Sequence, residues 1–355
     1  MHKIKLIAVL VFTFFAQISI AQDVPRIAFI YHTPEDTIGW SFEHDRARKD
    51  VEAYFGSQVE VSYFWSIAEG DEGEAKMKEL AAEGYDLIFA TSYGYLSGAI
   101  NAAFAYPDVK IEHSNGYVRA PNSSVYSIRT YEGRVPQGIL AGHMTETNKI
   151  GYIASFAIPY VLRDINAAFL AARSVNPDVE IEVVWLNTWE NHDLEAQAAR
   201  DLIANGADVL MQNTNTIQPT IVAQELGVFA FGQDSDMRAY GPDSQLTASI
   251  NHWSPYYIRR IQSLIDGTWE STDTWEGIAT DILEIGVFSD RVPLRIQEQA
   301  ADAVARIRSG RLHPFTGPIR RQDGTGWLAA GETASDSDLL TMGFFVEGIT
   351  GIIPR

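Results

Sequence analysis

The chain has no cysteine among its 355 residues. This absence excludes disulfide bonds, thiol nucleophiles, metal sites built from cysteine and a lipid-modified N-terminal cysteine. Secreted eukaryotic domains are often stabilised by disulfides. If the chain is secreted, its lack of cysteine therefore fits a bacterial periplasm better than a eukaryotic exterior. The length predicts about two domains.

Basic residues are also scarce. Lys and Arg number 27 against 46 Asp and Glu, and the formal net charge is −19. Such an acidic surface argues against nucleic acid and anionic lipid as partners, because both are themselves negatively charged. The overall charge says little about a small ligand, whose binding site is a local feature.

Long apolar runs are absent except at the N-terminus. There Lys3 and Lys5 precede an apolar stretch at residues 6–15, and residues 19–21 have the small-x-small form of a cleavage site. The stretch is shorter than the roughly 18 apolar residues that a membrane-spanning helix needs. We therefore expect residues 1–21 to be a secretory signal peptide, with an N-terminal membrane anchor as the alternative. The mature protein would be soluble and periplasmic.

The sequence also lacks common catalytic and metal-binding motifs. It has no G-x-S-x-G, no G-x-x-x-x-G-K-[ST] and no H-E-x-x-H, and its eight histidines are scattered. Glu43, His44 and Asp45 are adjacent on an expected helix, so their side chains diverge. We therefore expect no catalytic residue, no metal and no cofactor, which favours a binding protein over an enzyme.

What the sequence does contain is a regular alternation of predicted strands and helices. The first series has strands at 26–31, 59–65, 85–90 and 109–113, with helices at 41–55, 73–83 and 96–105. The second has strands at 149–155, 181–186, 208–212 and 228–232, with helices at 160–174, 194–205 and 219–226. Such runs predict parallel sheets with helices on both faces. The predicted fold class is therefore α/β, with two doubly wound parallel-sheet lobes.

Two similar lobes in one chain form a cleft, where ligands preferentially bind. The remainder of the chain is too short for a third lobe, so we expect it to return to the first lobe and cross back through hinge strands. The expected division is residues 22–120 plus about 251–275 for the first lobe, about 121–250 plus about 276–310 for the second, and 311–355 for a tail that crosses or packs on the lobes.

An ordered set of short motifs resembles one known family. The set comprises Ser41-Phe42, Tyr131-Glu-Gly, Gly138-Ile-Leu-Ala-Gly142, Lys149-Ile-Gly-Tyr152, Gly206-Ala-Asp-Val and Phe231-Gly-Gln-Asp-Ser-Asp236. Together they resemble the basic membrane protein (BMP, or PnrA-like) family, from about Arg26 to about His313. The resemblance implies the type I periplasmic-binding fold, with lobes joined by hinge crossovers, and a solute-binding protein of an ABC importer.

The resemblance also implies a receptor rather than a catalyst. Characterised relatives bind purine nucleosides, stack the base between aromatic side chains, and hold the ribose with an Asp and a Lys. Ser41 and Phe42 match the family's first-loop pattern Asp-x-Ser-Phe-Asn. At the Asp position of that pattern this sequence has a residue that is not acidic, and at the Asn position it has Glu43. Asp234 matches the family's Asp, whereas the Lys has no obvious counterpart near Asp236. A bare purine, or another flat nitrogen heterocycle, is therefore as consistent as a nucleoside.

Aromatic side chains in the expected cleft would supply affinity. Trp40 and Phe42 lie in the loop after the first strand, and Trp189 lies just past the strand that ends at Leu186. In an open α/β sheet, loops beyond the carboxyl ends of the strands face the ligand crevice. Stacking of a base on one ring contributes about 1–3 kcal/mol. The alternative is that each ring packs within its own lobe, and Trp253 lies either in the cleft or at the hinge.

Polar side chains at strand ends would supply specificity, because groups that a wrong ligand leaves unpaired are costly. Several have a structural alternative, such as a helix cap for Ser92 and Asp236 or a hinge salt bridge for Glu112. The candidate polar ligand contacts are Glu43, Ser92, Tyr93, Glu112, His113, Asn213, Thr214, Asp234 and Asp236.

We therefore expect a monomeric periplasmic receptor that captures a small planar ligand of the purine type by lobe closure and delivers it to the membrane permease of an ABC importer. Two alternatives remain open at this point. A ligand-sensing module for a membrane signalling partner would have the same features, and a nucleoside hydrolase would use Asp234 and Glu43.

Overall fold

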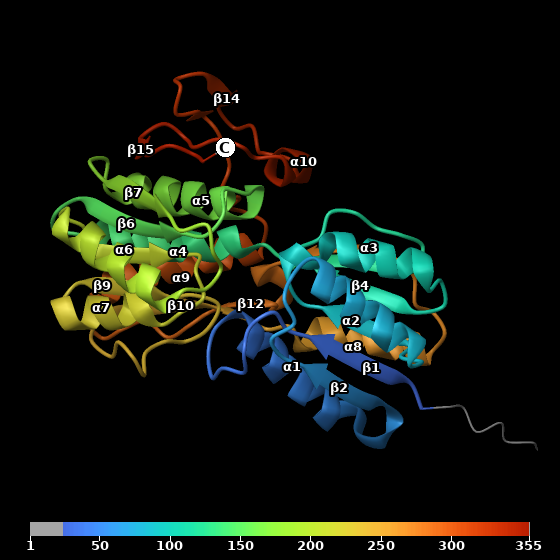
Figure 1. Cartoon of the computed structure of the whole chain (residues 1–355). Coiled ribbons are helices and arrows are strands. Elements are labelled where there is room, and N and C mark those ends of the chain that lie inside the picture. Colours follow the sequence, from blue (N-terminus) through green and yellow to red (C-terminus); the bar gives the residue numbers. More distant parts are fainter. Residues whose placement is uncertain (1–23, 355) are drawn as a thin grey trace, which may run out of the picture.

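The computed structural model describes residues 24–354, and the expected signal peptide lies outside this range. Figure 1 shows two lobes side by side, each with a β-sheet accompanied by helices. The predicted α/β class with parallel sheets is confirmed. Every helix within residues 24–354 is too short or too polar to cross a lipid bilayer.

The first lobe is built on a six-stranded sheet with the order β11-β5-β4-β3-β1-β2, in which all pairings are parallel. Its strands are β1 (Arg26–Ile30), β2 (Glu60–Phe64), β3 (Leu87–Ala90), β4 (Lys110–Ser114), β5 (Ser123–Ile128) and β11 (Asp273–Glu276). Its helices are α1 (Trp40–Phe55), α2 (Asp71–Ala82), α3 (Leu96–Ala105) and α8 (Ser254–Ile265). The central strands β1 and β3 are almost entirely buried, because helices cover both faces of the sheet.

The second lobe is built on a seven-stranded sheet with the order β12-β10-β9-β8-β6-β7-β15. Only the pairing of β10 with β12 is antiparallel within this described sheet. Its strands are β6 (Lys149–Ala154), β7 (Glu180–Trp185), β8 (Val209–Gln212), β9 (Phe229–Gly232), β10 (Gln245–Asn251), β12 (Leu283–Ile285) and β15 (Ile349–Thr350). Its helices are α4 (Thr130–Met144), α5 (Pro159–Val175), α6 (His192–Ala204), α7 (Gln218–Leu226) and α9 (Leu294–Arg308).

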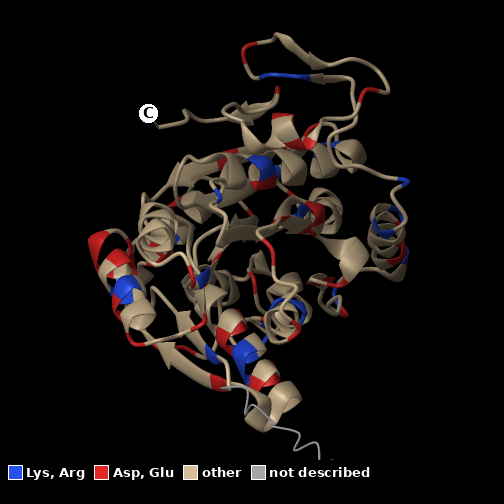
Figure 2. Cartoon of the chain, turned by 90° about the vertical axis from the view of Figure 1, so that its right-hand side faces the viewer, with Lys and Arg blue, Asp and Glu red and all other residues tan. Residues whose placement is uncertain are grey.

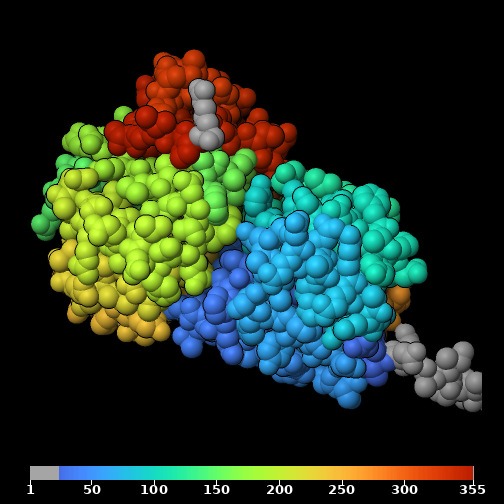
Figure 3. Space-filling view, in the orientation of Figure 1, coloured from blue at the N-terminus to red at the C-terminus, as the bar shows by residue number. Residues whose placement is uncertain are grey.

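The chain passes between the two sheets after β5, after β10 and after β11. These passages bring α8 and β11 back to the first lobe and return the chain to the second through β12. Figure 3 shows the surfaces of the two lobes in contact. Three passages of the chain therefore connect the two lobes.

The last residues of the chain pack on the second lobe. They form the antiparallel pair β13 (Ile319–Arg320) and β14 (Gly326–Leu328), the short helix α10 (Asp336–Leu340), and β15, which pairs with β7. Figure 1 shows this segment above α5. Asp336 accepts two hydrogen bonds of 2.7 Å from Arg129, which lies where the chain leaves the first sheet.

Acidic side chains lie on several helices and loops rather than in one cluster (Figure 2). Many of them lie beside basic side chains, as in the ion pairs of Lys149 with Glu182 and of Arg259 with Glu276. The excess negative charge is therefore spread over the surface and does not indicate where a ligand binds.

Candidate ligand-binding site

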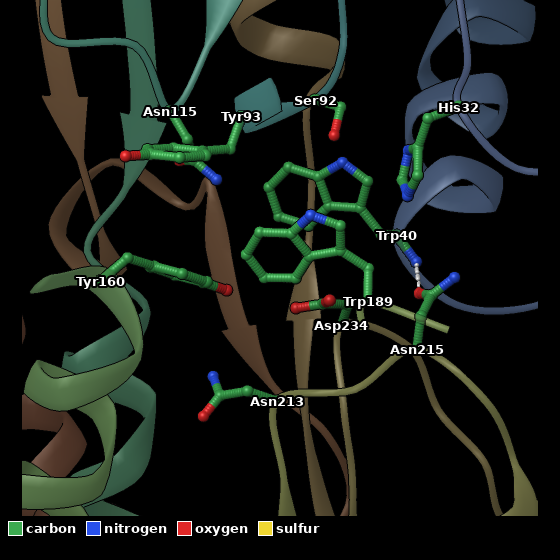
Figure 4. Close-up of a pocket in the computed structure, with 10 residues that line it drawn as sticks. All are labelled: His32, Trp40, Ser92, Tyr93, Asn115, Tyr160, Trp189, Asn213, Asn215 and Asp234. Carbon is green, nitrogen blue, oxygen red and sulfur yellow. Dashed lines mark hydrogen bonds between the residues drawn. The ribbon is translucent and has the colours of Figure 1, made fainter. Parts of the chain in front are cut away.

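A cavity lies between the lobes, at the carboxyl ends of the strands. It holds about 400 Å³ of space, open solvent at its mouth included. The side chains that line it follow β1, β3 and β4 in the first lobe and β6 to β9 in the second (Figure 4). They are His32, Trp40, Ser92, Tyr93 and Asn115 from the first lobe and Tyr160, Trp189, Asn213, Asn215 and Asp234 from the second.

Each lobe contributes one indole ring to the cavity wall. The Nε1 atom of Trp40 donates a hydrogen bond of 2.6 Å to the carbonyl oxygen of Thr91, which holds the ring in one orientation. Trp189 packs edge-on against Phe156, with 4.9 Å between the ring centroids. Figure 4 shows both indoles in the middle of the group of lining side chains. The two rings are therefore held by their own lobes and present apolar surface to the cavity.

Asp234 contributes the carboxylate of the cavity wall. Its Oδ1 atom accepts hydrogen bonds from Gln233 Nε2 at 2.8 Å and from Asn251 Nδ2 at 3.0 Å. Among the described residues, none donates a hydrogen bond to Oδ2, and the Tyr160 hydroxyl points toward this carboxylate in Figure 4. Burial raises the pKa of Asp234 to about 6, although the nearby Arg134 opposes this effect.

The charge of Arg134 lies behind this wall. Its side chain is 1% exposed, and it donates to Asp164 Oδ2 at 3.0 Å, to Gln137 Oε1 at 2.9 Å and to the carbonyl oxygen of Gln212 at 3.0 Å. It also donates to the Gln233 side chain. The guanidinium therefore stabilises the anion of Asp234 from behind and does not line the cavity.

The two asparagine amides of the second lobe are already engaged. Asn213 accepts from the Tyr152 hydroxyl and donates to Asp164 Oδ2 at 3.1 Å. Asn215 donates to Glu190 Oε2 at 3.1 Å and accepts from the backbone N–H of Trp40 at 2.5 Å. These amides therefore shape the wall, and most of their hydrogen-bonding capacity is used by the protein.

Direct contacts between the lobes close one side of the cavity. Besides the Trp40–Asn215 hydrogen bond drawn in Figure 4, the N–H of Gly39 donates to Ser235 Oγ at 2.9 Å. The Ser235 hydroxyl in turn donates to Glu43 Oε1 at 2.6 Å. Gly39 has a φ of +88°, and a Cβ there would lie 2.5 Å from Asn215 Oδ1. The structure therefore shows the lobes in a closed arrangement.

Glu43 belongs to this contact and does not line the cavity. Its side chain is 2% exposed, and its Oε2 atom lies 2.8 Å from Arg46 Nη2. Burial raises the pKa of Glu43 to about 7, against the lowering effect of the Ser235 hydrogen bond and of Arg46. Its position makes it a contact between lobes, where the sequence analysis expected a ligand contact.

The structure brings together six of the thirteen residues expected in the cleft: Trp40, Ser92, Tyr93, Trp189, Asn213 and Asp234. It adds four that the sequence analysis did not single out: His32, Asn115, Tyr160 and Asn215. His32, Asn115 and Asn215 each follow a strand within three residues, so the rule that identified Asp234 could have found them.

Glu112 and His113 lie inside the first lobe instead of the cavity. Glu112 is fully buried and accepts hydrogen bonds from Tyr256 at 2.6 Å, Arg260 at 2.6 Å and Trp269 at 2.7 Å. His113 is equally buried, and its Nε2 atom lies 2.9 Å from the carbonyl oxygen of Ser92. Glu112 thus forms a salt bridge with Arg260, but this bridge lies within the first lobe and not at the hinge, where the alternative placed it.

The remaining expected contacts also lie elsewhere. Thr214 and Trp253 are fully buried, and the Trp253 indole stacks on the His44 ring with 4.4 Å between centroids. The Asp236 carboxylate pairs with Arg238 and accepts from Gln245 Nε2 at 2.8 Å. Phe42 is half-buried on α1 and is not among the lining residues.

Comparison with known proteins identifies the family. The sequence matches the family model described as "ABC transporter substrate-binding protein PnrA-like" over residues 24–312. The chain belongs to this PnrA-like family. The resemblance inferred from its motifs is therefore confirmed, as is the expectation of a binding protein rather than an enzyme. PnrA-like proteins act outside the cytoplasm, where they bind small ligands for a membrane permease.

Individual relatives extend this result. A purine-binding protein of Brucella abortus (strain 2308) is 42% identical to this PnrA-like chain over 335 residues, which are 94% of this chain and 95% of that protein. A proposed ABC transporter glucose-binding protein of Haloferax volcanii is 33% identical over 328 residues, 92% of this chain and 81% of that protein. A solute-binding protein structure from Aeropyrum pernix K1 has a TM-score of 0.69 at 15% identity, covers 88% of this chain and 95% of that one, and shows the shared fold.

Proposed function

We propose that this PnrA-like protein is a monomeric periplasmic receptor that binds a purine base between its lobes and delivers it to the permease of an ABC importer. The N-terminal segment would direct its secretion. One observation carries the proposal: the interlobe cavity has an indole from each lobe and a carboxylate oxygen that has no protein donor among residues 24–354. A flat ring with N–H groups on its edge complements both features.

The aromatic wall favours a planar ligand. Base stacking on an aromatic side chain contributes about 1–3 kcal/mol per ring and is available to any base. Trp40 and Trp189 come from different lobes, so a ring that contacts both stabilises the closed arrangement relative to an open one. This links stacking to lobe closure, which is how a receptor of this type retains its ligand.

The charges of the cavity favour an uncharged ligand with donors. Asp234 is the only Asp, Glu, Lys or Arg among the described lining residues. A phosphate or carboxylate group on the ligand would be repelled by Asp234, and Arg134 is already engaged behind the wall. A ring N–H or an exocyclic amine would instead donate to Asp234 Oδ2. The ligand is therefore an unphosphorylated base rather than a nucleotide.

The polar groups favour a base over a nucleoside or a sugar. A ribose or a glucose ring presents several hydroxyls, each of which needs a partner when buried. The amides of Asn213 and Asn215, which could supply such partners, are bound to other protein groups. The relative from Brucella abortus that is named as purine-binding supports the same class of ligand.

Calorimetric titration with a ligand panel tests the proposal. The panel contains adenine, guanine, hypoxanthine, adenosine, adenosine monophosphate and glucose. We expect one purine base to bind with 1:1 stoichiometry and to be recovered chemically unchanged. At 100 times its dissociation constant, it should raise the free energy of unfolding by about 2.7 kcal/mol.

Three results would contradict the proposal. In the first, no purine binds. In the second, glucose or adenosine monophosphate binds more tightly than every base. In the third, a nucleoside is cleaved during the titration, which would indicate a hydrolase.

A further inference from the structure

His32 is the one lining side chain whose polar atoms are both buried and unpaired among residues 24–354. It is the second residue after β1, and its imidazole lies in the cavity wall at one end of the group drawn in Figure 4. Both Nδ1 and Nε2 are buried without a hydrogen-bond partner among the described residues. A buried polar group without a partner is unfavourable, so an unpaired imidazole in a cavity wall indicates a missing partner.

The other buried histidines of the first lobe behave differently. The Nδ1 atom of His44 lies within hydrogen-bond distance of the Tyr257 hydroxyl, and Nε2 of His113 lies 2.9 Å from the carbonyl oxygen of Ser92. Neither residue lines the cavity. Each of them has a protein partner for one ring nitrogen and leaves the other buried without one, whereas neither nitrogen of His32 has a partner among the described residues. Because His32 lines the cavity, a bound ligand could supply that partner.

The protonation state of His32 sets what it can recognise. Burial lowers the pKa of His32, although the nearby Glu69 opposes this effect. The Glu69 carboxylate accepts hydrogen bonds at Oε1 from the Ser92 hydroxyl and from the N–H of Gly94 at 3.0 Å, and it has no hydrogen bond to the imidazole. The imidazole is therefore neutral at pH 7, with one donor nitrogen and one acceptor nitrogen.

Asp234 and His32 can form different hydrogen bonds with a ligand. An ionised carboxylate only accepts hydrogen bonds, so Asp234 takes an N–H of the ligand. Adenine has a single ring N–H, guanine and hypoxanthine have two, and each of these bases also has unprotonated ring nitrogens. Once a ring N–H of the base is directed to Asp234, the unprotonated ring nitrogens remain as acceptors for His32.

We propose that His32 is a specificity-determining residue of this cavity, and that its imidazole N–H donates a hydrogen bond to an unprotonated ring nitrogen of the bound purine. This inference rests on the proposed function and goes beyond it. A ligand has to present a donor to Asp234 and an acceptor to His32 at the same time. Flat apolar rings, and heterocycles that carry only donors, are thereby rejected even though they stack well.

A series of single-atom ligand analogues tests this inference. In 1-deaza, 3-deaza and 7-deaza purines, one ring nitrogen is replaced by C–H, while ring shape and stacking surface are kept. We expect the wild-type protein to bind one of these analogues at least tenfold more weakly than the parent base. The variant His32→Phe should bind the parent base and that same analogue with equal, reduced affinity.

His143→Phe is the matched control. His143 lies near the end of α4, away from the cavity, and pairs with Gln299. This variant should keep both the affinity and the analogue ranking of the wild type. Thermal melting of the variants shows whether each is folded, and His32→Phe should melt at or above the wild-type temperature because it removes an unpaired buried polar group.

The outcomes distinguish a failure of the proposed function from a failure of the inference about His32. If no purine binds the wild type, the proposed function fails. If a purine binds but the wild type binds every deaza analogue as well as the parent, no ring nitrogen is recognised and the inference is overturned, whether or not His32→Phe folds. The inference also fails if the variant keeps the wild-type ranking of analogues.

Discussion

Asp234 and Glu112 are both buried carboxylates near the carboxyl ends of parallel strands, one in each lobe. Three donors from other elements surround Glu112, and Arg260 on α8 neutralises it at 2.6 Å. Asp234 accepts hydrogen bonds from the amides of Gln233 and Asn251 at Oδ1 only, and its carboxylate lines the cavity. The same sequence signal thus produced a structural ion pair in one lobe and a candidate ligand contact in the other. The number of donors that the rest of the fold brings to each carboxylate makes the difference.

The largest expected effect is on the structural carboxylate. Glu112→Ala leaves the Arg260 guanidinium buried without its partner, and such a loss lowers the free energy of unfolding by about 3–5 kcal/mol. Denaturant unfolding measures this change. Molecules of the variant that remain folded should bind the purine with nearly wild-type affinity, and a variant as stable as the wild type would contradict the assigned role.

The opposite pattern is expected for the candidate ligand contact. Asp234→Asn keeps an oxygen that can accept from Gln233 and Asn251, but it removes the charge that accepts the ligand N–H. A hydrogen bond to a charged group contributes about 1.5–3 kcal/mol, so the dissociation constant should rise roughly ten- to hundredfold. Calorimetry measures the affinity and thermal melting the stability. Unchanged affinity together with a large loss of stability would place Asp234 with Glu112 as a structural group.

The indole rings should show a similar loss of affinity. Trp40→Ala and Trp189→Ala each remove one stacking surface, which should weaken purine binding by about 1–3 kcal/mol. Trp327→Ala is the matched control, because Trp327 packs against Phe315 and Phe344 in the C-terminal segment, outside the cavity. Equal affinities for the wild type and both cavity variants would show that the ligand does not lie between the indoles.

The smallest expected effects concern pH, because protonation of Asp234 weakens ligand binding whereas protonation of Glu43 favours lobe closure. Ligand binding needs the Asp234 anion, whose pKa burial raises to about 6, so affinity should fall as the pH drops below 6. Burial between the lobes raises the pKa of Glu43 to about 7, and opening would return it toward its ordinary value. The closed arrangement therefore binds a proton more tightly than the open one. Closure should become easier as the pH falls from 7 toward that ordinary value.

The two effects partly cancel in the wild type, and Glu43→Gln separates them. The variant keeps an acceptor for the Ser235 hydroxyl but has no group to titrate. Its affinity should fall roughly three- to fivefold from pH 7.5 to pH 5.5, and the wild type should lose less over the same range. Calorimetry at the two pH values measures both losses. Identical pH profiles for the two proteins would contradict a role of Glu43 in closure.

The repeated strand–helix alternation was predictable because its signals are local. Apolar runs such as 87–90 and glycines after helices are visible in the sequence. The helix α4 was missed because Gly138, Gly142 and an internal Pro136 lower its helix propensity. These glycines serve tertiary packing, since a Cβ at Gly138 would lie 2.3 Å from the carbonyl oxygen of Ala168 on α5. A signal that belongs to a contact between two helices cannot be read from one of them.

The candidate site was predictable in part for the same reason. The position of Asp234 and Trp40 beyond strand ends is a local feature, and the structure places both at one cavity. The Glu112 carboxylate accepts hydrogen bonds from Tyr256, Arg260 and Trp269, which lie 144 to 157 residues further along the chain. These hydrogen bonds could not be inferred from the residues next to Glu112 in the sequence. His32 was overlooked although it obeys the same rule, because only the fold shows that its ring nitrogens have no partner among residues 24–354.

The most direct test of the central claim is a crystal structure of the wild-type protein with its tightest-binding purine base. We expect the ring between the indoles of Trp40 and Trp189, with a ligand N–H within hydrogen-bond distance of Asp234 Oδ2. A purine bound outside the interlobe cavity, or bound there without contact to Asp234, would contradict the account.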